Sequence, residues 1–442
     1  MKASAQWKTF IVGLTAALAL RVGVGAEPAW AENVPLKADS GDTAWVLVSS
    51  AFVLAMLMPG LALFYGGLVR TKNVLGTIMQ SIMILGVVSL LWILFGYSLA
   101  FGPDKGGIIG GLDWIGLSGV GSQPHAVYGP TIPHQAFMLF QLMFAAIAPA
   151  LITGAFAERK RFTSVVLFAA MWSVLVYVPL AHWIWGGGWL AQMGALDFAG
   201  GAVIHISSGT AALVCAIVLG QRRGYGTDYM APHNLPMTLL GTGFLWFGWF
   251  GFNGGSALGA NGVAVSAIIA THAAACMGAL SWCGAEWVHR GKPTVLGVAS
   301  GAVAGLATVT PAAGYISPLP AILIGLVAGM TCYAAIVWKG RFGYDDSLDV
   351  VGIHGVGGVI GVLATGLFAS KVVNPGGADG LVFGNPGLFG IQFLVVVVTT
   401  VFTLVGTFAI LKIVDAMTGL RVSPEEEATG LDLSQHNERA YS

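Results

Sequence analysis

Charged residues are scarce in this sequence. Only 9% of its 442 residues are Asp, Glu, Lys or Arg, whereas an ordinary soluble domain contains about 25%. In contrast, 56% of the residues are hydrophobic, and apolar runs of about 20 residues, the length that a helix needs to cross a bilayer, recur from Trp45 to Val414. The alternating ten-residue segments typical of an outer-membrane barrel are absent. The sequence therefore predicts an all-α polytopic membrane protein.

The sequence also lacks an excess of either charge and lacks cofactor motifs. Its 20 basic and 20 acidic residues balance, which removes the case for a nucleic-acid partner. The four cysteines stand in apolar stretches without metal-ligand spacing, so we expect them to be core residues. No phosphate-binding glycine motif of the Walker type is present. We therefore expect no cofactor and no ATP-driven pumping.

The amino-terminal residues 1–31 have the pattern of a secretory signal peptide. Two lysines precede the apolar run 9–20, which is too short to span a bilayer, and the small-x-small sequence AWA at 29–31 offers a cleavage site. Cleavage there would leave residues 32–43 as a periplasmic segment at an external amino terminus.

Polar, Gly and Pro clusters divide the remaining apolar sequence into about eleven spans. They lie near 44–67, 74–101, 134–155, 163–183, 201–219, 234–252, 260–288, 294–309, 318–338, 350–369 and 387–414. We therefore expect a transmembrane transport domain over 44–415, followed by a tail over 416–442.

Basic residues occupy alternate loops. They are Arg70 and Lys72; Arg159, Lys160 and Arg161; Arg222 and Arg223; Arg290 and Lys292; Lys339 and Arg341. By the positive-inside rule these loops are cytoplasmic. An odd number of spans and an external amino terminus then place the tail in the cytoplasm.

Short matches indicate that the chain repeats itself. FYGG at 64–67 ends the first span and FNGG at 252–255 ends the sixth, while Ile-His pairs stand in the fifth and tenth spans. A repeat with an odd number of spans places its second copy inverted in the membrane, as in many transporters. The alternative is that a glycine-rich chain produces such matches by chance. We expect an inverted repeat of five plus five spans and a final helix.

The two Ile-His pairs supply the candidates for chemistry inside the membrane, His205 and His354. Ionisable side chains at this depth are costly and usually face a pore or the protein interior. Either histidine alone could be neutral and bonded to a backbone carbonyl, but the matched pair favours a shared site. Two neutral imidazoles in contact can share and pass a proton. His272 has no counterpart in the repeat, and we expect it to be structural.

Two aspartates precede the histidine spans. Asp197 and Asp349 each stand where an aspartate can accept the free N–H groups of a helix start. Asp197 could alternatively be a cation ligand. We expect both residues to be N-caps, and Asp197 could also support a cation site.

A few aromatic residues could bind a cation. Phe140 and Phe144 lie on one helix face at i, i+4, Phe252 closes the sixth span, and Trp185 lies at the outer end of the fourth. Aromatic faces attract cations by roughly 0.5–2 kcal/mol, and Ser256 could add a hydrogen-bond acceptor. The alternative is that these rings belong to an interfacial belt or to the core.

Several motifs resemble those of the ammonium transporters of the Amt/Mep/Rh superfamily, and most closely those of its bacterial Amt branch. They are PGLALFYGGLVR, AHWIWGGG, GALDFAGG, GWFGFNGGS, LGVASGAVAGLATVTPAAGY, GIHGVGG and GLDLSQHNERAY. The resemblance runs from about residue 40 to the end. It implies an eleven-helix protomer, a homotrimer with one pore per protomer, and a bacterial inner (cytoplasmic) membrane location.

The resemblance also implies residue roles. Trp185, Phe140 and Ser256 correspond to the external ammonium recruitment site. Phe144 and Phe252 correspond to a stacked gate, and His205 and His354 correspond to the twin histidines of the pore. Asp197 corresponds to the aspartate that supports recruitment indirectly by ordering the backbone. The expected function is uptake of NH4+, which loses its proton so that NH3 crosses an apolar pore while the proton follows a separate relay, giving net charge movement.

The resemblance further predicts partners and leaves alternatives open. Methylammonium is a second candidate substrate, lipid surrounds the helices, and the tail is expected to dock a cytoplasmic PII signalling protein. Asn437 stands where the family commonly has glycine, which puts the tail conformation in doubt. An ammonium sensor with the same fold and an Rh-like neutral gas channel are the alternatives; the short tail favours a transporter over a sensor. A zinc enzyme would need a third ligand beside the histidines, so we expect no enzyme.

Overall fold

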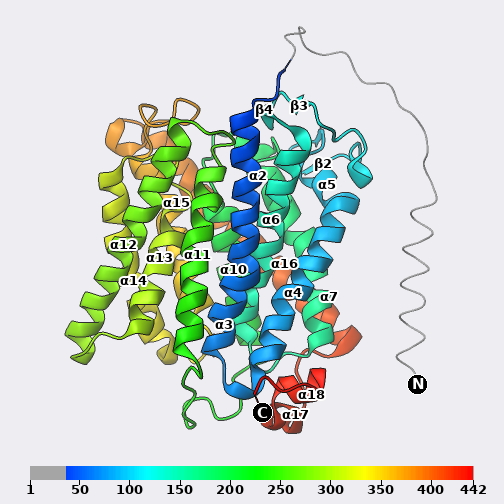
Figure 1. Cartoon of the computed structure of the whole chain (residues 1–442), viewed down its shortest axis with the longest axis vertical. Helices are drawn as coiled ribbons and strands as arrows, with labels where there is room; N and C mark the ends of the chain where they lie inside the picture. The colour runs from blue at the N-terminus through cyan, green and yellow to red at the C-terminus, as the bar shows by residue number, and fades with distance from the viewer. Residues whose placement is uncertain (1–35, 442) are drawn as a thin grey trace. The chain divides into compact units, whose positions relative to one another are not determined.

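The computed structural model describes residues 36–441, in which the apolar runs form long helices lying side by side (Figure 1). Within these residues, ten helices are long and apolar enough to cross a membrane. They are Ser40–Leu68, Thr71–Phe101, His134–Phe156, Phe162–Gln192, Gly201–Leu219, Leu235–Gly255, Gly262–Arg290, Pro318–Phe342, Val351–Phe368 and Pro386–Thr418. A shorter apolar helix, Val295–Val309, lies where the eighth span was predicted. The predicted helical membrane fold is confirmed, whereas the predicted signal peptide lies outside the described residues.

Most spans in the first half consist of two or more helical segments. These are α2 (Ser40–Ala55), η1 (Met56–Leu61) and α3 (Ala62–Leu68); α4 (Val74–Leu91), η3 (Trp92–Gly96) and α5 (Tyr97–Phe101); α6 (His134–Ile152) and η5 (Thr153–Phe156); α7 (Phe162–Trp172), η6 (Ser173–Tyr177), α8 (Val178–Ile184) and α9 (Trp189–Gln192); η7 (Gly201–Ile206) and α10 (Ser207–Leu219).

The second half contains longer uninterrupted helices. These are α11 (Leu235–Gly255), α12 (Gly262–Arg290), α13 (Val295–Val309), α14 (Pro318–Lys339), η9 (Val351–Gly355) with α15 (Val356–Phe368), and α16 (Pro386–Thr418). The segments η1, η3, η6, η7 and η9 are π-helical turns, which are rare and frequent at functional sites. Both η7 and η9 contain one histidine of the predicted pair.

The helix bundle has two distinct ends (Figure 1). One end, the hairpin face, carries two short antiparallel hairpins, β1 (Asp104–Lys105) with β2 (Ile109–Gly110) and β3 (Pro124–His125) with β4 (Gly129–Pro133). The other end, the tail face, carries α17 (Pro424–Thr429) and α18 (Leu431–His436). The first helix begins at Ser40, inside the segment predicted to precede the membrane domain, and α16 continues past residue 415 to Thr418.

Three of the predicted cytoplasmic basic residues, Arg70, Arg222 and Lys339, are ion-paired at the tail face. The Glu158 carboxylate lies 2.7 Å from the Arg70 guanidinium and 3.4 Å from that of Arg222, which also contacts Asp345 at 2.8 Å. Burial alone would raise the pKa of Glu158, but the Arg222 charge and the hydrogen bonds from Arg70 hold it below its ordinary value. The loop charges therefore also tie the spans together.

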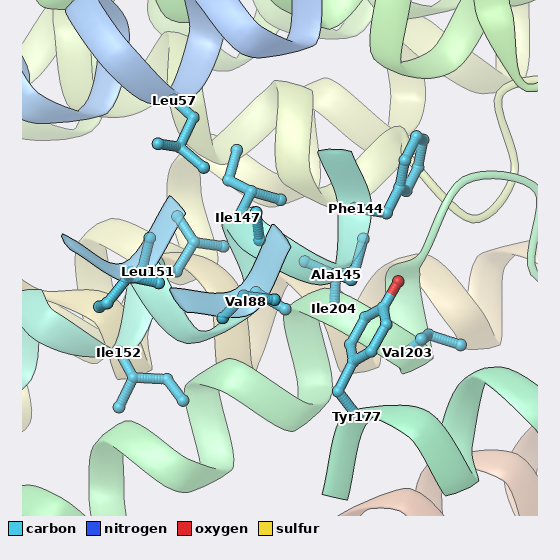
Figure 2. Packing of buried hydrophobic residues seen from close by; sticks show 14 of the residues in the cluster. Leu57, Val88, Phe144, Ala145, Ile147, Leu151, Ile152, Tyr177, Val203 and Ile204 are labelled. Atoms are coloured by element: carbon cyan, nitrogen blue, oxygen red, sulfur yellow. The ribbon is translucent and has the colours of Figure 1, made fainter. Parts of the chain in front are cut away.

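A large cluster of buried apolar side chains lies between the helices, and two smaller clusters accompany it. Figure 2 shows Phe144 and Ile147 of α6 in the same buried cluster as Val203 and Ile204 of η7 and Tyr177 of η6. This packing holds the segment that carries His205 rigidly against α6, which carries two of the predicted aromatic site residues.

Candidate functional site

The two predicted histidines meet in the structure. Nδ1 of His205 and Nδ1 of His354 are 3.1 Å apart, and the rings stack with centroids 5.1 Å apart at an interplanar angle of 16°. His205 is fully buried and His354 is 5% exposed. Because each neutral imidazole has one N–H, one Nδ1 donates and the other accepts, so the pair shares a single proton between these atoms. The two histidines are 149 residues apart in the sequence, and the fold brings them into contact.

The small residues that follow each histidine explain how the two spans approach. A Cβ added to Gly209 would lie 2.2 Å from Cα of Gly355, and one added to Gly358 would lie 2.8 Å from the Ile206 backbone nitrogen and 3.0 Å from Cβ of His205. Larger side chains at these positions would force the backbones apart. The glycines therefore let η7–α10 and η9–α15 cross closely enough for the rings to touch.

Asp197 holds the start of the first histidine segment. Its two carboxylate oxygens accept hydrogen bonds from the N–H groups of residues 200–203 at 2.6–3.1 Å. These donors have no helical partner, so the carboxylate satisfies them as the N-cap interpretation predicted. Burial raises the pKa of Asp197, and the four N–H bonds oppose that shift. The residue caps the helix that carries His205.

The corresponding cap in the second half is Asp346, and the prediction for Asp349 is wrong. Oδ2 of Asp346 accepts from the Val351 N–H at 2.7 Å. Asp349 has a positive φ of 64°, which turns the chain just before η9, and its carboxylate pairs with Lys339 instead. The sequence spacing could have predicted this cap, because His354 follows Asp346 by eight residues, the same interval that separates His205 from Asp197. Each half therefore has an aspartate eight residues before its histidine that accepts backbone N–H groups at the start of the histidine segment, four at Asp197 and one at Asp346.

The predicted aromatic residues form a line from the hairpin face to the histidines. The rings of Phe144 and Phe252 are stacked with centroids 4.3 Å apart at 17°. Phe140 meets Phe144 edge-to-face at 4.8 Å, and Phe144 meets Trp185 edge-to-face at 6.0 Å. Below the stacked pair, the centroid of Phe252 is 6.3 Å from that of His205. Five rings from distant parts of the sequence therefore follow one another along the bundle.

Trp185 and Ser256 lie half-buried at the outer end of this line. The α8 helix ends at Ile184, and the indole Nε1 of Trp185 donates to the backbone oxygen of Asp197 at 2.8 Å. Ser256 follows α11, and its hydroxyl donates to the Phe252 backbone oxygen at 2.8 Å. Its lone pairs remain available, so this hydroxyl can still accept a hydrogen bond from a cation.

On the tail-face side of the histidines the structure has a narrow cavity. It is lined by Met56, Leu61, Phe64, Tyr65, Leu151, Leu245, Trp249, Val303, Leu348, Val350, Ile353 and His354. The Tyr65 hydroxyl already donates to the Leu151 backbone oxygen at 2.9 Å, and the Trp249 indole donates to the Thr310 hydroxyl at 2.9 Å. Among the lining side chains, His354 can therefore still form a further hydrogen bond. The cavity is suited to a small neutral molecule.

His205 carries a further signal of a ligand. Its Nε2 atom is buried and has no hydrogen-bond partner, although buried polar atoms are nearly always paired. The ring also stacks on Trp249 with centroids 5.7 Å apart, which fixes its orientation. Nε2 is thus buried beside the aromatic line without a protein partner.

His272 lies outside this arrangement, as predicted. Its Nε2 is 3.6 Å from the Cys276 sulfur on the same helix, and its ring lies beside those of Trp246 and Phe250. Among residues 36–441, no three His, Cys, Asp or Glu side chains gather as a metal site would require.

The tail packs onto the tail face. Asp432 Oδ1 accepts from the Gly76 N–H at 2.8 Å, and the Leu431 N–H donates to the Asn73 side chain at 2.8 Å. Asn437 ends α18 in the left-handed region at φ 54° and ψ 36°, where glycine is favoured and asparagine is the best-tolerated alternative. Asparagine at this position is therefore compatible with the docked tail.

Comparisons with known proteins agree on one family. A family model described as the Ammonium Transporter Family matches residues 44–441. An ammonium transporter of Bacillus subtilis is 52% identical over 402 residues, covering 91% of this chain and 98% of the relative. The ammonium transporter Amt1 of Archaeoglobus fulgidus is 49% identical, covering 91% of this chain and 99% of the relative.

Solved structures give the same result. The crystal structure of Saccharomyces cerevisiae Mep2 matches with a TM-score of 0.82 at 37% identity and covers 88% of both chains. A sensor Amt protein matches with a TM-score of 0.80 at 29% identity, covering 92% of this chain and all of that one.

Proposed function

The chain belongs to the Ammonium Transporter Family and is an ammonium transporter rather than an enzyme, and from this premise we propose that it splits each ammonium ion into ammonia and a proton that cross by different routes. The observation that carries the proposal is the contact between His205 and His354 at the inner end of the aromatic line, with Nε2 of His205 buried and unpartnered. This arrangement offers a proton acceptor where a dehydrated cation could not remain charged.

Recruitment is assigned to the group at the hairpin face, which consists of the half-buried Trp185 and Ser256 and the buried ring of Phe140. The faces of Trp185 and Phe140 would attract the cation, each by roughly 0.5–2 kcal/mol, and the Ser256 hydroxyl would accept one of its hydrogen bonds. Asp197 acts indirectly, because it orders the backbone that receives the Trp185 indole. No carboxylate touches the cation in this scheme, so the ion is not held too tightly to move on.

Selectivity follows from the next step of the path. The stacked rings of Phe144 and Phe252 close the way to the histidines, and the cavity beyond them is almost entirely apolar. An unpaired cation in such surroundings is penalised by many kcal/mol. Ammonium can escape this cost by releasing a proton near the gate. Potassium has no proton to release, so a cation of similar size is excluded.

The proton would pass through the histidine pair. When Nε2 of His205 accepts a proton, its Nδ1 proton can move to Nδ1 of His354, and the Nε2 proton of His354 can leave toward the tail face. One proton enters the pair and one leaves, so the relay returns to a neutral state after the rings resume their starting tautomers. Ammonia and the proton together carry one positive charge inward per cycle.

The surroundings of the pore complete the proposal. We assign the tail face to the cytoplasm of a bacterial inner membrane, because the predicted cytoplasmic basic loops all lie there, and the hairpin face to the outside. The exposed apolar sides of α12, α14 and α16 would include the contacts of a homotrimer with one pore per protomer. The docked tail offers a surface for a PII signalling protein, and methylammonium is a second substrate that the recruitment group could accept.

The test is current measurement on purified protein in liposomes adsorbed to a solid-supported membrane. Ammonium pulses should give a transient inward current that saturates with concentration, whereas equal potassium pulses should give none. Ammonium uptake without current would instead indicate a neutral gas channel. Ammonium binding without uptake would indicate a sensor, and either outcome would overturn the proposed mechanism.

A further inference from the structure

A buried histidine outside the pore, His182, faces two hydrogen-bond acceptors at once. Its Nδ1 is 2.9 Å from the backbone oxygen of Ala100, and its Nε2 is 2.9 Å from Oδ1 of Asp104. A carbonyl oxygen can only accept, and so can an ionised carboxylate. The Asp104 oxygens also accept from the Gly107 N–H at 2.8 and 3.0 Å. The His182 ring is therefore held at both nitrogens, by Ala100 on one side and by Asp104 on the other.

The pair joins two segments that are far apart in the sequence. His182 is fully buried in α8, whereas the Asp104 side chain is 33% exposed on the β1–β2 hairpin. Two further bonds fasten the same hairpin to this region: the Trp183 indole donates to the Ile108 oxygen at 2.8 Å, and the Trp189 N–H donates to the Gly107 oxygen at 3.0 Å. The hairpin is thus tied down on both sides of the turn that follows α8.

That turn carries Trp185 of the recruitment group. The Trp185 N–H donates to the Ala181 oxygen at 2.8 Å, and the Gly186 and Gly188 N–H groups donate to the His182 oxygen at 3.0 and 2.9 Å. The backbone oxygen of His182 therefore accepts the hydrogen bonds that shape this turn. Any shift of the ring away from Ala100 and Asp104 would be passed to the indole one helical turn later.

We propose that His182, held between Ala100 and Asp104, is a positioning residue that sets Trp185 for ammonium binding at the outer mouth. This role rests on the proposed function. Loss of the Asp104 contact would let the ring shift and would move the Trp185 indole. The consequence is weaker ammonium binding with an unchanged maximal rate, because the gate and the histidine pair are untouched.

The test compares the wild type with Asp104→Asn and Asp104→Ala in proteoliposome current measurements, with Asp113→Asn as the matched control. The asparagine amide can still form a hydrogen bond with Nε2, so this variant keeps the ring in place. We expect Asp104→Asn to keep the wild-type KM for NH4+. Asp104→Ala should raise KM roughly three- to tenfold at neutral pH without lowering the maximal current.

Several outcomes would overturn the proposal. A folded Asp104→Ala protein with the wild-type KM would show that the contact does not position Trp185. If Asp104→Ala fails to fold, a raised KM in Asp104→Asn would show that keeping the hydrogen bond to Nε2 is not enough to position the indole. A loss of maximal current with unchanged KM in either variant would place the effect in the pore rather than at the mouth. A wild type without any ammonium current would overturn the proposed function as well, so the two failures are distinct.

Discussion

The indole Nε1 of Trp185 donates a hydrogen bond to the backbone oxygen of Asp197, 2.8 Å away. The carboxylate of the same aspartate accepts four backbone N–H groups at the start of the segment that carries His205. One residue therefore links the outer aromatic group to the pore histidine, through its backbone in one direction and through its side chain in the other.

This link predicts the effect of Asp197→Asn. An amide has one acceptor oxygen and places an NH2 group against two of the four N–H donors, so about half of the cap is lost. We expect the ammonium current to fall at least about tenfold, corresponding to about 1.4 kcal/mol or more, together with a lower melting temperature. Asp349→Asn is the control, because that carboxylate caps no helix; equal losses in both variants would contradict the assignment of the cap.

The glycine crossing of the two histidine spans predicts a second effect. Gly209→Val would place Cβ within 2.2 Å of Gly355 Cα and separate the rings, so the current should disappear while some folded protein remains. Gly243→Ala is the matched control, since a Cβ there meets nothing within 4 Å and glycine in a helix interior costs about 0.5–1 kcal/mol relative to alanine. A Gly209→Val protein with wild-type current would show that the close approach is not needed.

The sequence was sufficient for the helical spans, because hydrophobic runs fix the helices, and it predicted that the two histidines of the matching repeats would meet. It failed at Asp349, because the helix start depends on the backbone turn there, where a positive φ takes Asp349 out of the cap position and leaves Asp346 in it. It also could not reveal the contact between His182 and Asp104, since no local pattern joins a helix to a short hairpin 78 residues away.

The buried charge of Lys160 should make the stability of the protein depend on pH. Its ammonium is buried at 4.2 Å and 3.9 Å from the ring centroids of Phe156 and Phe168 and has no hydrogen-bond partner. Burial lowers the pKa of Lys160 from 10.5 to about 8. Between these values the unfolded chain binds the proton and the folded chain does not, so the free energy of unfolding rises with pH through this window.

Replacing this lysine should therefore stabilise the protein. We expect Lys160→Met to raise the free energy of unfolding by about 1–3 kcal/mol at pH 7, with the advantage shrinking between about pH 8 and 10.5. Unfolding curves in detergent at several pH values measure this, and the exposed Lys371→Met serves as the control. A pH-independent difference would show that charge burial is not the cause.

The left-handed backbone conformation of Asn437 should determine whether the tail stays docked. Alanine at φ 54° costs roughly 1–2 kcal/mol, whereas glycine adopts this conformation freely. Asn437→Ala should expose the tail to limited proteolysis, and Asn437→Gly should leave it protected. Equal cleavage of both variants would mean that this residue does not hold α18 in place.

The separation of ammonia from its proton is tested most directly by the ion selectivity of a His205→Ala/His354→Ala variant. Currents on a solid-supported membrane are compared for ammonium and potassium pulses, in the wild type and in the variant. The account predicts an ammonium-specific current in the wild type that in the variant either disappears or becomes permeable to potassium, because the relay is gone and water can enter the space the rings leave. An unchanged, ammonium-specific current in the variant would contradict it, since the proton would then cross without the two histidines.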